Sequence, residues 1–529
     1  MGKNVLLLLV LLFGGTLLSA EKKLIYYGWD SPDMKRLIQE WEAMRALPFA
    51  GYCFAIDGDD KDGHFQAGML WTKRPVEQAA FDAMAEDAKR IAEIVDATGW
   101  ELFPMAWANW GSVKWHDDEA WAILLANLRN YLRVAKACKA KGICFDPEPY
   151  TPDKVFSFNP KDGVDFPTTA ALARKRGKEF MKVIAEEWDD MVMLTFGLWD
   201  WTYGGSLQVV NATPEERLKI CERAGNGIIP YFMDGCLEVV PEKLRIITAT
   251  EAAYYYRHPI EYLKTMRMMT GRNSASEALV DPALRETFRR QVEGGFGMFL
   301  DTFIERGVKE LENQVRYALN VSEEYVWMYA EKGRYWPGAQ AVGQLTDKRW
   351  EELLPGCTAA MKKGQVSTTD GVPAAENLVR NPGMDGDLSE YDFWLAEWSK
   401  GKISSTPDGG REGGAMKFTG VLEGCYLQSF PVLAGEAYYI SAYAKATGES
   451  YPAIHVRWKD EQNHWLDGEM KSVNFFPRQE GWVKAEARIV VPYGAASKMV
   501  VLLFSHAGKD EENDVVLFDD LEVRRIELP

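Results

Sequence analysis

Short apolar or aromatic runs alternate with longer amphipathic stretches from residue 23 to about residue 355, and this alternation constrains the fold most. The amphipathic stretches carry apolar residues at three- and four-residue spacing, which predicts helices over 34–47, 76–99, 120–142 and 168–188. Eight runs predict strands: 24–30, 51–57, 101–110, 142–148, 192–197, 228–235, 245–256 and 325–332. Residues 294–303 are an alternative for the eighth strand, although their surroundings resemble a helical region.

Continuous apolar strands that are separated by helices require a sheet covered on both faces. Eight such strands predict the α/β class, with a closed parallel (β/α)8 barrel, or TIM barrel, over residues 21–355. An open doubly wound sheet is the alternative. It normally has a glycine-rich phosphate turn after an early strand, and the segment YYGWDSPDMK is not such a turn.

The composition and the hydrophobic pattern of the sequence change after residue 355. Residues 356–376 are polar and rich in turn-forming residues, which is typical of a linker. Residues 377–529 contain short alternating runs separated by Gly, Asn and Pro. This pattern predicts an all-β sandwich of the jelly-roll kind as a second domain.

The first 20 residues predict a signal peptide. Lys3 precedes an apolar stretch, and the small residues Ser19 and Ala20 suit a signal peptidase. No cysteine follows the stretch to carry a lipoprotein anchor, and no later run reaches the roughly 18 apolar residues of a membrane span. We therefore expect a secreted or periplasmic protein.

Composition and motifs exclude several function classes. The formal net charge of −17 opposes phosphate backbones, so nucleic acid is not an expected partner. The seven cysteines are scattered without a CxxC pair and predict core thiols. The six histidines show no HExxH or HxH spacing, DGDDKDGH (57–64) fails the calcium-loop pattern, and no GxSxG occurs. We predict no catalytic metal and no organic cofactor.

Two carboxylates leave the fourth predicted strand together. Residues two apart on a strand face the same side, so Asp146 and Glu148 project into one space. In a barrel, this end of the strand forms the active site. When two carboxylates lie close together, the charge of one raises the pKa of the other, which leaves a proton donor beside an ionised group. Asp146 and Glu148 are therefore candidate catalytic residues.

Polar and aromatic residues also occur at the other strand exits. Rings stack on sugar C–H faces, while carboxylates and amides bind hydroxyl groups, so the mixture predicts a sugar-binding cleft. Helix capping by aspartates and packing by tyrosines are the structural alternatives. Glu251 is a further candidate catalytic residue, and Tyr27 and Tyr254 are among the aromatic residues at these exits. The candidate substrate-binding residues are Trp29, Asp57, Trp107, Asn109, Tyr150, Trp199, Tyr231, Asp234, Trp327 and Glu331.

The segment Asp146-Pro-Glu148-Pro resembles the Asp-x-Glu pair of the chitinase-like glycoside hydrolase family 18, with Cys144 where that family has a further Asp. This resemblance implies that Glu148 is the acid and that Asp146 orients a substrate N-acetyl group as the internal nucleophile. Tyr231 and Trp327 resemble that family's tyrosine at the sixth strand and its tryptophan on the last strand.

The same segment also resembles the large clan of barrel glycosidases with Asn-Glu-Pro at strand four and a Glu nucleophile at strand seven. Glu148-Pro149 and Glu251 are similar to those places, with Pro147 where the clan has Asn. Under both resemblances Glu148 is the general acid/base, and its partner is Asp146 or Glu251. An inverting reaction with two carboxylates stays open.

The predicted sandwich resembles carbohydrate-binding modules of the CenC type in its opening NLVRNPGMDGD and its closing VVLFDDLEVRRI. The resemblance implies a structural calcium at Asp519 or Asp520, with a strand-end salt bridge as the alternative. Candidate stacking residues are Trp394, Trp398, Trp458 and Trp465.

These observations predict an exported glycoside hydrolase that acts on an oligo- or polysaccharide. One alternative is a non-catalytic glycan-binding protein that uses the barrel and the sandwich. A second is a polysaccharide lyase, which an acidic mouth disfavours because it repels uronates. The sugar, the linkage and the oligomeric state stay open.

Overall fold

The computed structural model describes thirteen ranges: residues 22–108, 113–148, 150, 154–203, 212–271, 273–336, 343–366, 371–433, 435–466, 472–477, 479–491, 496–506 and 513–527. The predicted signal peptide and Asn109 lie outside them. The chain forms two compact units. The first comprises Met1–Tyr255, Met266–Ile304 and Val321–Pro355, and the second comprises Tyr256–Thr265, Glu305–Asn320 and Gly356–Pro529. The predicted domain limits at 21–355, 356–376 and 377–529 stay a prediction.

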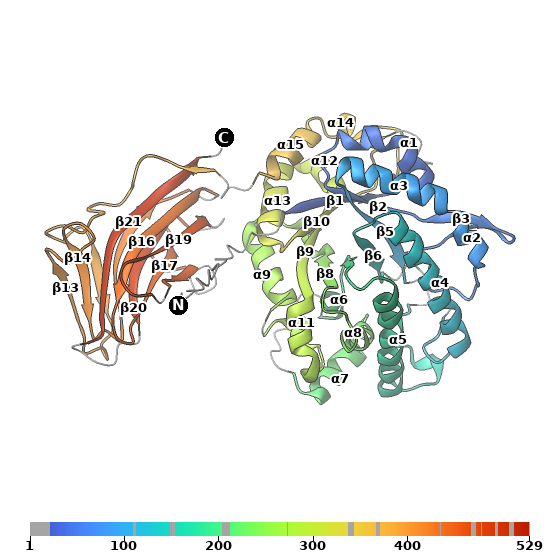
Figure 1. Cartoon of the computed structure of the whole chain (residues 1–529), viewed down its shortest axis with the longest axis horizontal. Coiled ribbons are helices and arrows are strands. Elements are labelled where there is room, and N and C mark those ends of the chain that lie inside the picture. The colour runs from blue at the N-terminus through green and yellow to red at the C-terminus, as the bar shows by residue number, and fades with distance from the viewer. Residues whose placement is uncertain are drawn as a thin grey trace, which may run out of the picture. The chain divides into compact units, whose positions relative to one another are not determined.

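Eight parallel strands of the first unit close into a barrel in the order β1-β10-β9-β8-β7-β6-β5-β2 (Figure 1). This confirms the predicted α/β class and the (β/α)8 barrel. The strands are β1 (Lys23–Gly28), β2 (Gly51–Phe54), β5 (Glu101–Trp107), β6 (Gly142–Asp146), β7 (Val192–Thr195), β8 (Arg245–Thr250), β9 (Val292–Phe299) and β10 (Tyr325–Ala330). A separate hairpin joins β3 (Asp57–Asp60) to β4 (Gly63–Gln66).

Helices separate the strands along the chain, and several begin at an aspartate cap. The carboxylates of Asp33, Asp117 and Asp165 accept a backbone hydrogen bond at the starts of α1, α4 and α5. The first helices are α1 (Met34–Arg45), α2 (Gln78–Asp82), α3 (Ala85–Thr98), α4 (Asp118–Ala137), α5 (Phe166–Glu187), α6 (Trp199–Tyr203), α7 (Pro214–Arg223) and α8 (Ile229–Leu237). Those that follow are α9 (Pro259–Met269), α10 (Ala275–Ala278), α11 (Arg285–Gln291), α12 (Phe303–Arg306), α13 (Val308–Val321), α14 (Trp350–Leu353) and α15 (Cys357–Gly364).

Two predicted elements of the barrel are wrong. Residues 228–235 form helix α8 instead of the sixth strand, and 292–299 form the strand β9 in addition to β10. Consequently β8 is the sixth barrel strand, β9 the seventh and β10 the eighth. Helix α8 is buried at every position except Tyr231, so it lacks the polar face by which an amphipathic helix is recognised.

The barrel interior is filled by side chains and is not a pore, as expected for eight strands. Buried residues from seven of the strands, with Phe196 just after β7, form one apolar cluster: Ile25, Cys53, Phe103, Met105, Cys144, Val192, Leu194, Phe196, Ile247, Ala249, Tyr325 and Trp327. The functional side chains must therefore lie at an end of the barrel.

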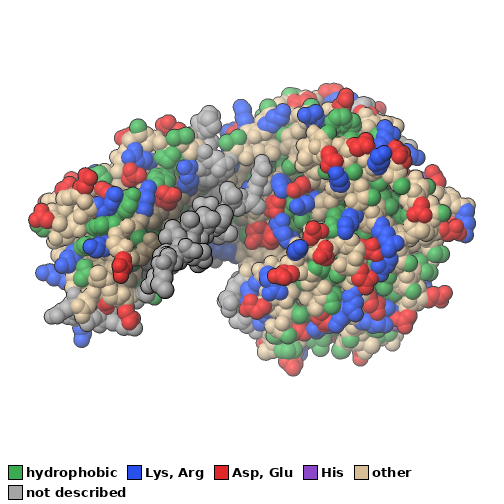
Figure 2. Space-filling model, in the orientation of Figure 1, with side chains coloured by type: hydrophobic (Ala, Val, Ile, Leu, Met, Phe, Trp, Pro, Cys, Tyr) green, Lys and Arg blue, Asp and Glu red, His purple; other side chains and the backbone are tan. Residues whose placement is uncertain are grey.

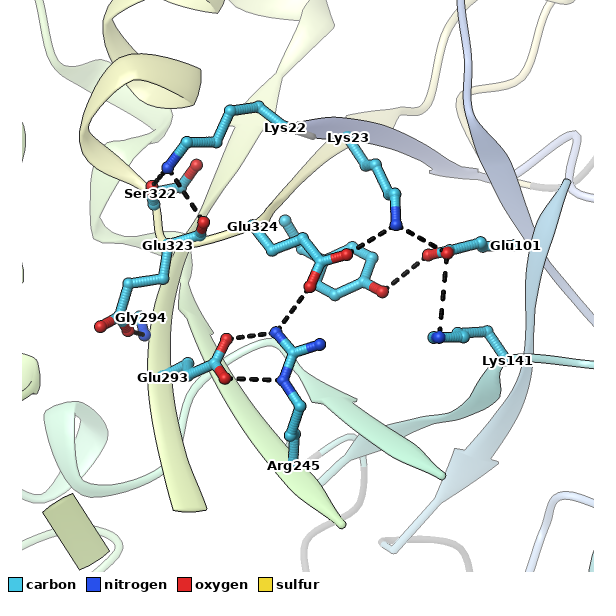
Figure 3. Close-up of polar contacts among 11 residues, drawn as sticks. Lys22, Lys23, Glu101, Lys141, Arg245, Glu293, Gly294, Ser322, Glu323 and Glu324 are labelled. Atoms are coloured by element: carbon cyan, nitrogen blue, oxygen red, sulfur yellow. Dashed lines mark hydrogen bonds and ion pairs between the residues drawn. The ribbon is translucent and has the colours of Figure 1, made fainter. Parts of the chain in front are cut away.

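An ion-pair network, here called the base network, closes the amino-terminal end of the barrel (Figure 3). Lys23 lies 2.7 Å from Glu101 and 2.6 Å from Glu324. Arg245 pairs with Glu324 at 2.6 Å and holds Glu293 with two nitrogens. These residues stand at or next to the starts of five strands, so an active site in this barrel is expected at the opposite, carboxyl-terminal end, here called the mouth.

The second unit contains a β-sandwich whose two antiparallel sheets enclose one apolar core. One sheet has β11 (Val372–Pro373), β13 (Lys402–Thr406), β14 (Ala415–Thr419), β16 (Ala437–Ala446), β19 (Val483–Val490) and β21 (Val515–Glu527). The other has β12 (Asp392–Leu395), β15 (Glu423–Pro431), β17 (Tyr451–Lys459), β18 (Ser472–Phe475) and β20 (Lys498–His506). The predicted sandwich is thus confirmed.

All seven cysteines are buried and unbridged, which confirms that they are core thiols. Acidic and basic side chains are interspersed over the visible face of both units (Figure 2). None of the helices in the described ranges has the length and apolar composition of a membrane span.

Candidate active site at the barrel mouth

Asp146 is the last residue of β6 and is fully buried. One of its oxygens accepts a hydrogen bond of 2.9 Å from the Glu148 N–H, and the other accepts one of 2.8 Å from the Tyr150 hydroxyl. Burial raises the pKa of Asp146 to about 7, and the charge of Glu148 adds to the rise while both hydrogen bonds oppose it. The two carboxylates predicted at this strand exit are therefore coupled, and no arginine or lysine pairs with Asp146 among the described residues.

Glu251 approaches the same pair from a strand two places further around the barrel. It is the first residue of the 3₁₀ helix η2 (Glu251–Tyr255), directly after β8. Burial raises its pKa to about 8, and the charge of Glu148 is the second cause, followed by those of Asp146 and Asp200. Glu251 thus keeps a proton at neutral pH, chiefly because it is buried and also because the charge of Glu148 acts on it.

Asp200 of α6 supports Glu251. Its buried carboxylate accepts a hydrogen bond of 2.8 Å from the Leu198 N–H and one of 2.7 Å from the Thr250 hydroxyl. Thr250 ends β8 and precedes Glu251 directly. Asp200 therefore fixes the strand end that carries Glu251 and adds negative charge beside it.

Four aromatic rings form a platform beside these carboxyl groups: Tyr27, Tyr254, Phe299 and Tyr329, each half-buried. The Tyr329 ring lies 5.5 Å from that of Tyr27, 6.1 Å from that of Tyr254 and 5.3 Å from that of Phe299, with interplanar angles of 25°, 10° and 28°. The charge of Glu148 raises the pKa of both Tyr254 and Tyr329, after burial and nearer carboxylates. The platform therefore borders the carboxyl groups.

Tyr329 and Phe299 are not among the site residues predicted from the sequence. Tyr329 is the register partner of Tyr27 across the pairing of β1 with β10, so their stacking follows from barrel closure. Phe299 ends β9, whose segment reads as a helical region. Recognising β9 as a strand would have placed Phe299 at the mouth.

A short hydrogen-bond chain links two predicted residues through Tyr329. The Trp29 Nε1–H donates to the Tyr329 hydroxyl at 2.7 Å, and that hydroxyl donates to Oε1 of Glu331 at 2.9 Å. The backbone N–H of Glu331 donates to Asp301 at 2.9 Å. Trp29 and Glu331 therefore orient the central ring of the platform.

The other predicted binding residues differ in their places. Trp107 ends β5 in register with Asp146 of β6, so it lies at the same end of the barrel, and it is half-buried against the interior cluster as the platform tyrosines are. Asp57 lies in the β3–β4 hairpin, with an oxygen 3.6 Å from Nε2 of His64. Trp199 is fully buried against Phe288, and Trp327 is fully buried against Phe196 at 3.9 Å. In this conformation Trp199 and Trp327 pack inside the protein and offer no ring to a ligand.

Tyr231 and Asp234 are not at a strand end, because their segment is helix α8. Asp234 is fully buried and lies 2.6 Å from Arg217, whose guanidinium also covers the Tyr231 ring at 4.3 Å. Both residues hold helices together instead of facing the mouth, which corrects their predicted position. Tyr231 thus does not occupy the sixth-strand place of the family 18 resemblance.

The second resemblance also requires a correction. Glu251 follows β8, which is the sixth barrel strand and not the seventh. The predicted strand at 228–235, which is a helix, shifts the count by one, and the missed β9 kept the total at eight. The charge of Glu148 nevertheless acts on Glu251. The two residues therefore remain a candidate catalytic pair, although their strands do not correspond to those of the clan.

In the sandwich, the carboxylate of Asp519 accepts backbone hydrogen bonds from Arg411 and Asp520, and Asp520 pairs with the Arg411 side chain. This is the salt-bridge alternative, and calcium there stays a prediction. Trp458 belongs to the core, whereas Trp394 and Trp398 are exposed. Trp465 lies beneath Arg457 at 4.1 Å.

The sequence matches no known protein family, and no curated protein matches it. Similar solved structures include the CBM22-1 xylan-binding domain of Paenibacillus barcinonensis Xyn10C, with 17% identity over 30% of this chain and 99% of that chain and a TM-score of 0.24. Another is the arabinose-bound α-L-arabinofuranosidase MgGH51, with 12% identity over 30% of this chain and 27% of that chain and a TM-score of 0.23.

A third is the enzymatically active domain of tailspike protein 4 of bacteriophage CBA120, with 12% identity over 28% of this chain and 21% of that chain and a TM-score of 0.24. By name, these neighbours include glycoside hydrolases and carbohydrate-binding modules. We draw no functional conclusion from them, because every TM-score is below 0.5.

Proposed function

We propose that this chain is an exported glycoside hydrolase that cleaves O-glycosidic bonds by carboxyl general acid/base catalysis. The observation that carries the proposal is the coupling of Glu148 to Glu251 across the barrel mouth, where the charge of Glu148 helps to raise the pKa of Glu251 to about 8. Glycoside hydrolysis requires two carboxyl groups at one site, one of which can act as a proton donor.

Glu251 is the proposed proton donor, because it retains its proton at neutral pH. It would protonate the leaving oxygen of the glycosidic bond while Glu148 stabilises or attacks the anomeric carbon, or activates a water molecule. This assignment exchanges the roles expected from sequence, in which Glu148 is the acid/base. Asp146 lies beneath Glu148, and its buried carboxyl group holds the Glu148 backbone through the 2.9 Å hydrogen bond.

The proposed substrate carries few or no negative charges. The platform of Tyr27, Tyr254, Phe299 and Tyr329 offers ring faces on which sugar C–H groups stack. The carboxyl groups beside it bring no positive charge to neutralise a uronate or a sulfate, which also disfavours a lyase.

The test uses the full chain with a panel of aryl glycosides and oligosaccharides. Glu148→Gln and Glu251→Gln should each lower kcat/KM about 10²- to 10⁴-fold on natural linkages. Glu77→Gln, whose side chain is 62% exposed, is the control and should keep the native rate. Near-native rates in both mouth variants would overturn the assignment, and glycan binding without product from the native chain would favour the non-catalytic alternative.

A substrate with a good leaving group separates the two roles. Such a leaving group needs no protonation, so Glu251→Gln should retain most of its activity on a dinitrophenyl glycoside, whereas Glu148→Gln should not. The reverse pattern would restore Glu148 as the acid.

A further inference from the structure

Two histidines face each other on one sheet of the sandwich. His455 of β17 and His506 of β20 bring their Nε2 atoms within 3.2 Å. The two strands pair along their whole length, from Tyr451 with His506 to Lys459 with Lys498. The backbone that carries both imidazoles is therefore fixed by the sheet.

Phe504 sets the orientation of both rings. Its ring stacks on His455 at 4.5 Å and 16° and on His506 at 4.3 Å and 17°. His455 is only 8% exposed and His506 is half-buried. Little rotamer freedom is left to lose when a ligand binds between the nitrogens.

The separation of the nitrogens fits a shared metal ion. Two nitrogen ligands that each lie about 2.05 Å from a tetrahedral zinc ion are about 3.3 Å apart. A hydrogen bond between two neutral imidazoles also fits 3.2 Å, and the metal would replace the proton of that bond. Imidazole pairs prefer borderline divalent ions to calcium or magnesium.

We propose that His455 and His506 form a site for a divalent transition-metal ion such as Zn²⁺, Ni²⁺ or Cu²⁺, independently of the function of the barrel. Among the described residues, no set of three or more His, Cys, Asp or Glu side chains forms a metal site. Water or an oxygen of a bound molecule would fill the other coordination positions. Such a site exchanges its metal readily and loses it on acidification, when the imidazoles take up protons.

The first test is calorimetric titration of the full chain with ZnCl₂ and with NiCl₂. We expect one site in the native protein, and an affinity lower by about tenfold or more in His455→Ala and in His506→Ala. His464→Ala is the matched control, because His464 lies in the same sandwich with 77% of its side chain exposed. Native affinity in both site variants, or an equal loss in the control, would overturn the proposal.

The second test needs no variant. With less than one equivalent of CuCl₂, the electron paramagnetic resonance spectrum of the native chain should show two equatorial imidazole nitrogens. A spectrum with one nitrogen or none would overturn the proposal even if the alanine variants fail to fold.

Discussion

The Tyr254 hydroxyl donates a hydrogen bond of 2.8 Å to Oε1 of Glu251, three residues earlier in the same 3₁₀ helix. This contact lowers the pKa of Glu251, whereas burial and the charge of Glu148 raise it to about 8. Tyr254 therefore sets the pH at which the proposed proton donor loses its proton, and it is a positioning residue for Glu251.

Tyr254→Phe should shift the alkaline limb of the kcat/KM profile to higher pH, because the pKa of Glu251 rises when the hydrogen bond is removed. In the native chain that limb should fall near pH 8, where Glu251 deprotonates. At pH 7 we expect a loss of about fivefold, since one hydrogen bond contributes about 1 kcal/mol. Tyr255→Phe, at a side chain that is 71% exposed, is the control. An unshifted limb in Tyr254→Phe would contradict the assigned role.

Asp146→Asn should stabilise the chain above neutral pH at the expense of activity. Because the folded pKa is raised from 3.8 to about 7, the folded state holds this proton more tightly, and stability falls as pH rises between these values. The amide has no such dependence, so the free energy of unfolding of the variant relative to that of the native chain should be higher at pH 8 than at pH 4 by about 4 kcal/mol. Denaturant unfolding at both pH values measures it. If the free energies of unfolding of the native chain and the variant differ by the same amount at pH 4 and at pH 8, the pKa of Asp146 is not raised in the folded state.

Glu324→Gln should destabilise the barrel by about 2 kcal/mol, because it removes one carboxylate from between the two partly buried cations of the base network. The Glu324 side chain is 6% exposed and contacts both Lys23 and Arg245. Glu77→Gln, in an exposed pair with Lys61, should cost less than about 1 kcal/mol. Thermal unfolding of the two variants tests the comparison.

The pH dependence of this variant has a definite sign. Burial raises the pKa of Glu324, but the hydrogen bond from Lys23 and the charge of Arg245 outweigh burial and lower it. The contribution of Glu324 is therefore complete above its ordinary pKa of 4.5 and is lost as pH falls through the lowered value. The difference between native chain and variant should narrow in acid, and a constant difference would contradict the ionic account.

Gly177→Ala should destabilise the packing of α5 on α8 by about 2 kcal/mol. A Cβ atom at residue 177 would lie 1.8 Å from the backbone oxygen of Phe232, so the helices would have to separate. Gly225 is the matched control, because a Cβ atom there meets nothing within 4 Å. If Gly177→Ala unfolds at the same temperature as Gly225→Ala, the close approach of the two helices does not limit stability.

The barrel and the sandwich were predictable because most of their strands are apolar or alternating runs between turn residues. The segment 228–235 was not, because a helix that is buried on nearly all sides has the same continuous apolar pattern as a buried strand. The strand β9 was obscured by its glycines. A Cβ atom at Gly295 would lie 2.5 Å from the Tyr325 oxygen, and one at Gly297 would lie 2.6 Å from the Trp327 ring. Both glycines are needed so that large residues fit in the barrel.

The Asp146 and Glu148 pair was predictable from a local rule, the alternation of side chains along one strand. The surroundings of Glu148 were harder to predict. The approach of Glu251 and the stacking of Tyr27 on Tyr329 depend on strand order and barrel closure. A sequence gives the ends of strands but not which ends are neighbours. The platform therefore emerges only from the three-dimensional structure.

The base network determines at which end of the barrel a ligand can bind and leave. Charged side chains occupy the amino-terminal end and packed side chains fill the interior, so, within the described residues, a ligand has no path through the barrel. In the proposed reaction, the substrate would bind and the products would leave at the same, carboxyl-terminal end. Departing fragments should therefore compete with the next incoming chain, and inhibition by reaction products should be competitive.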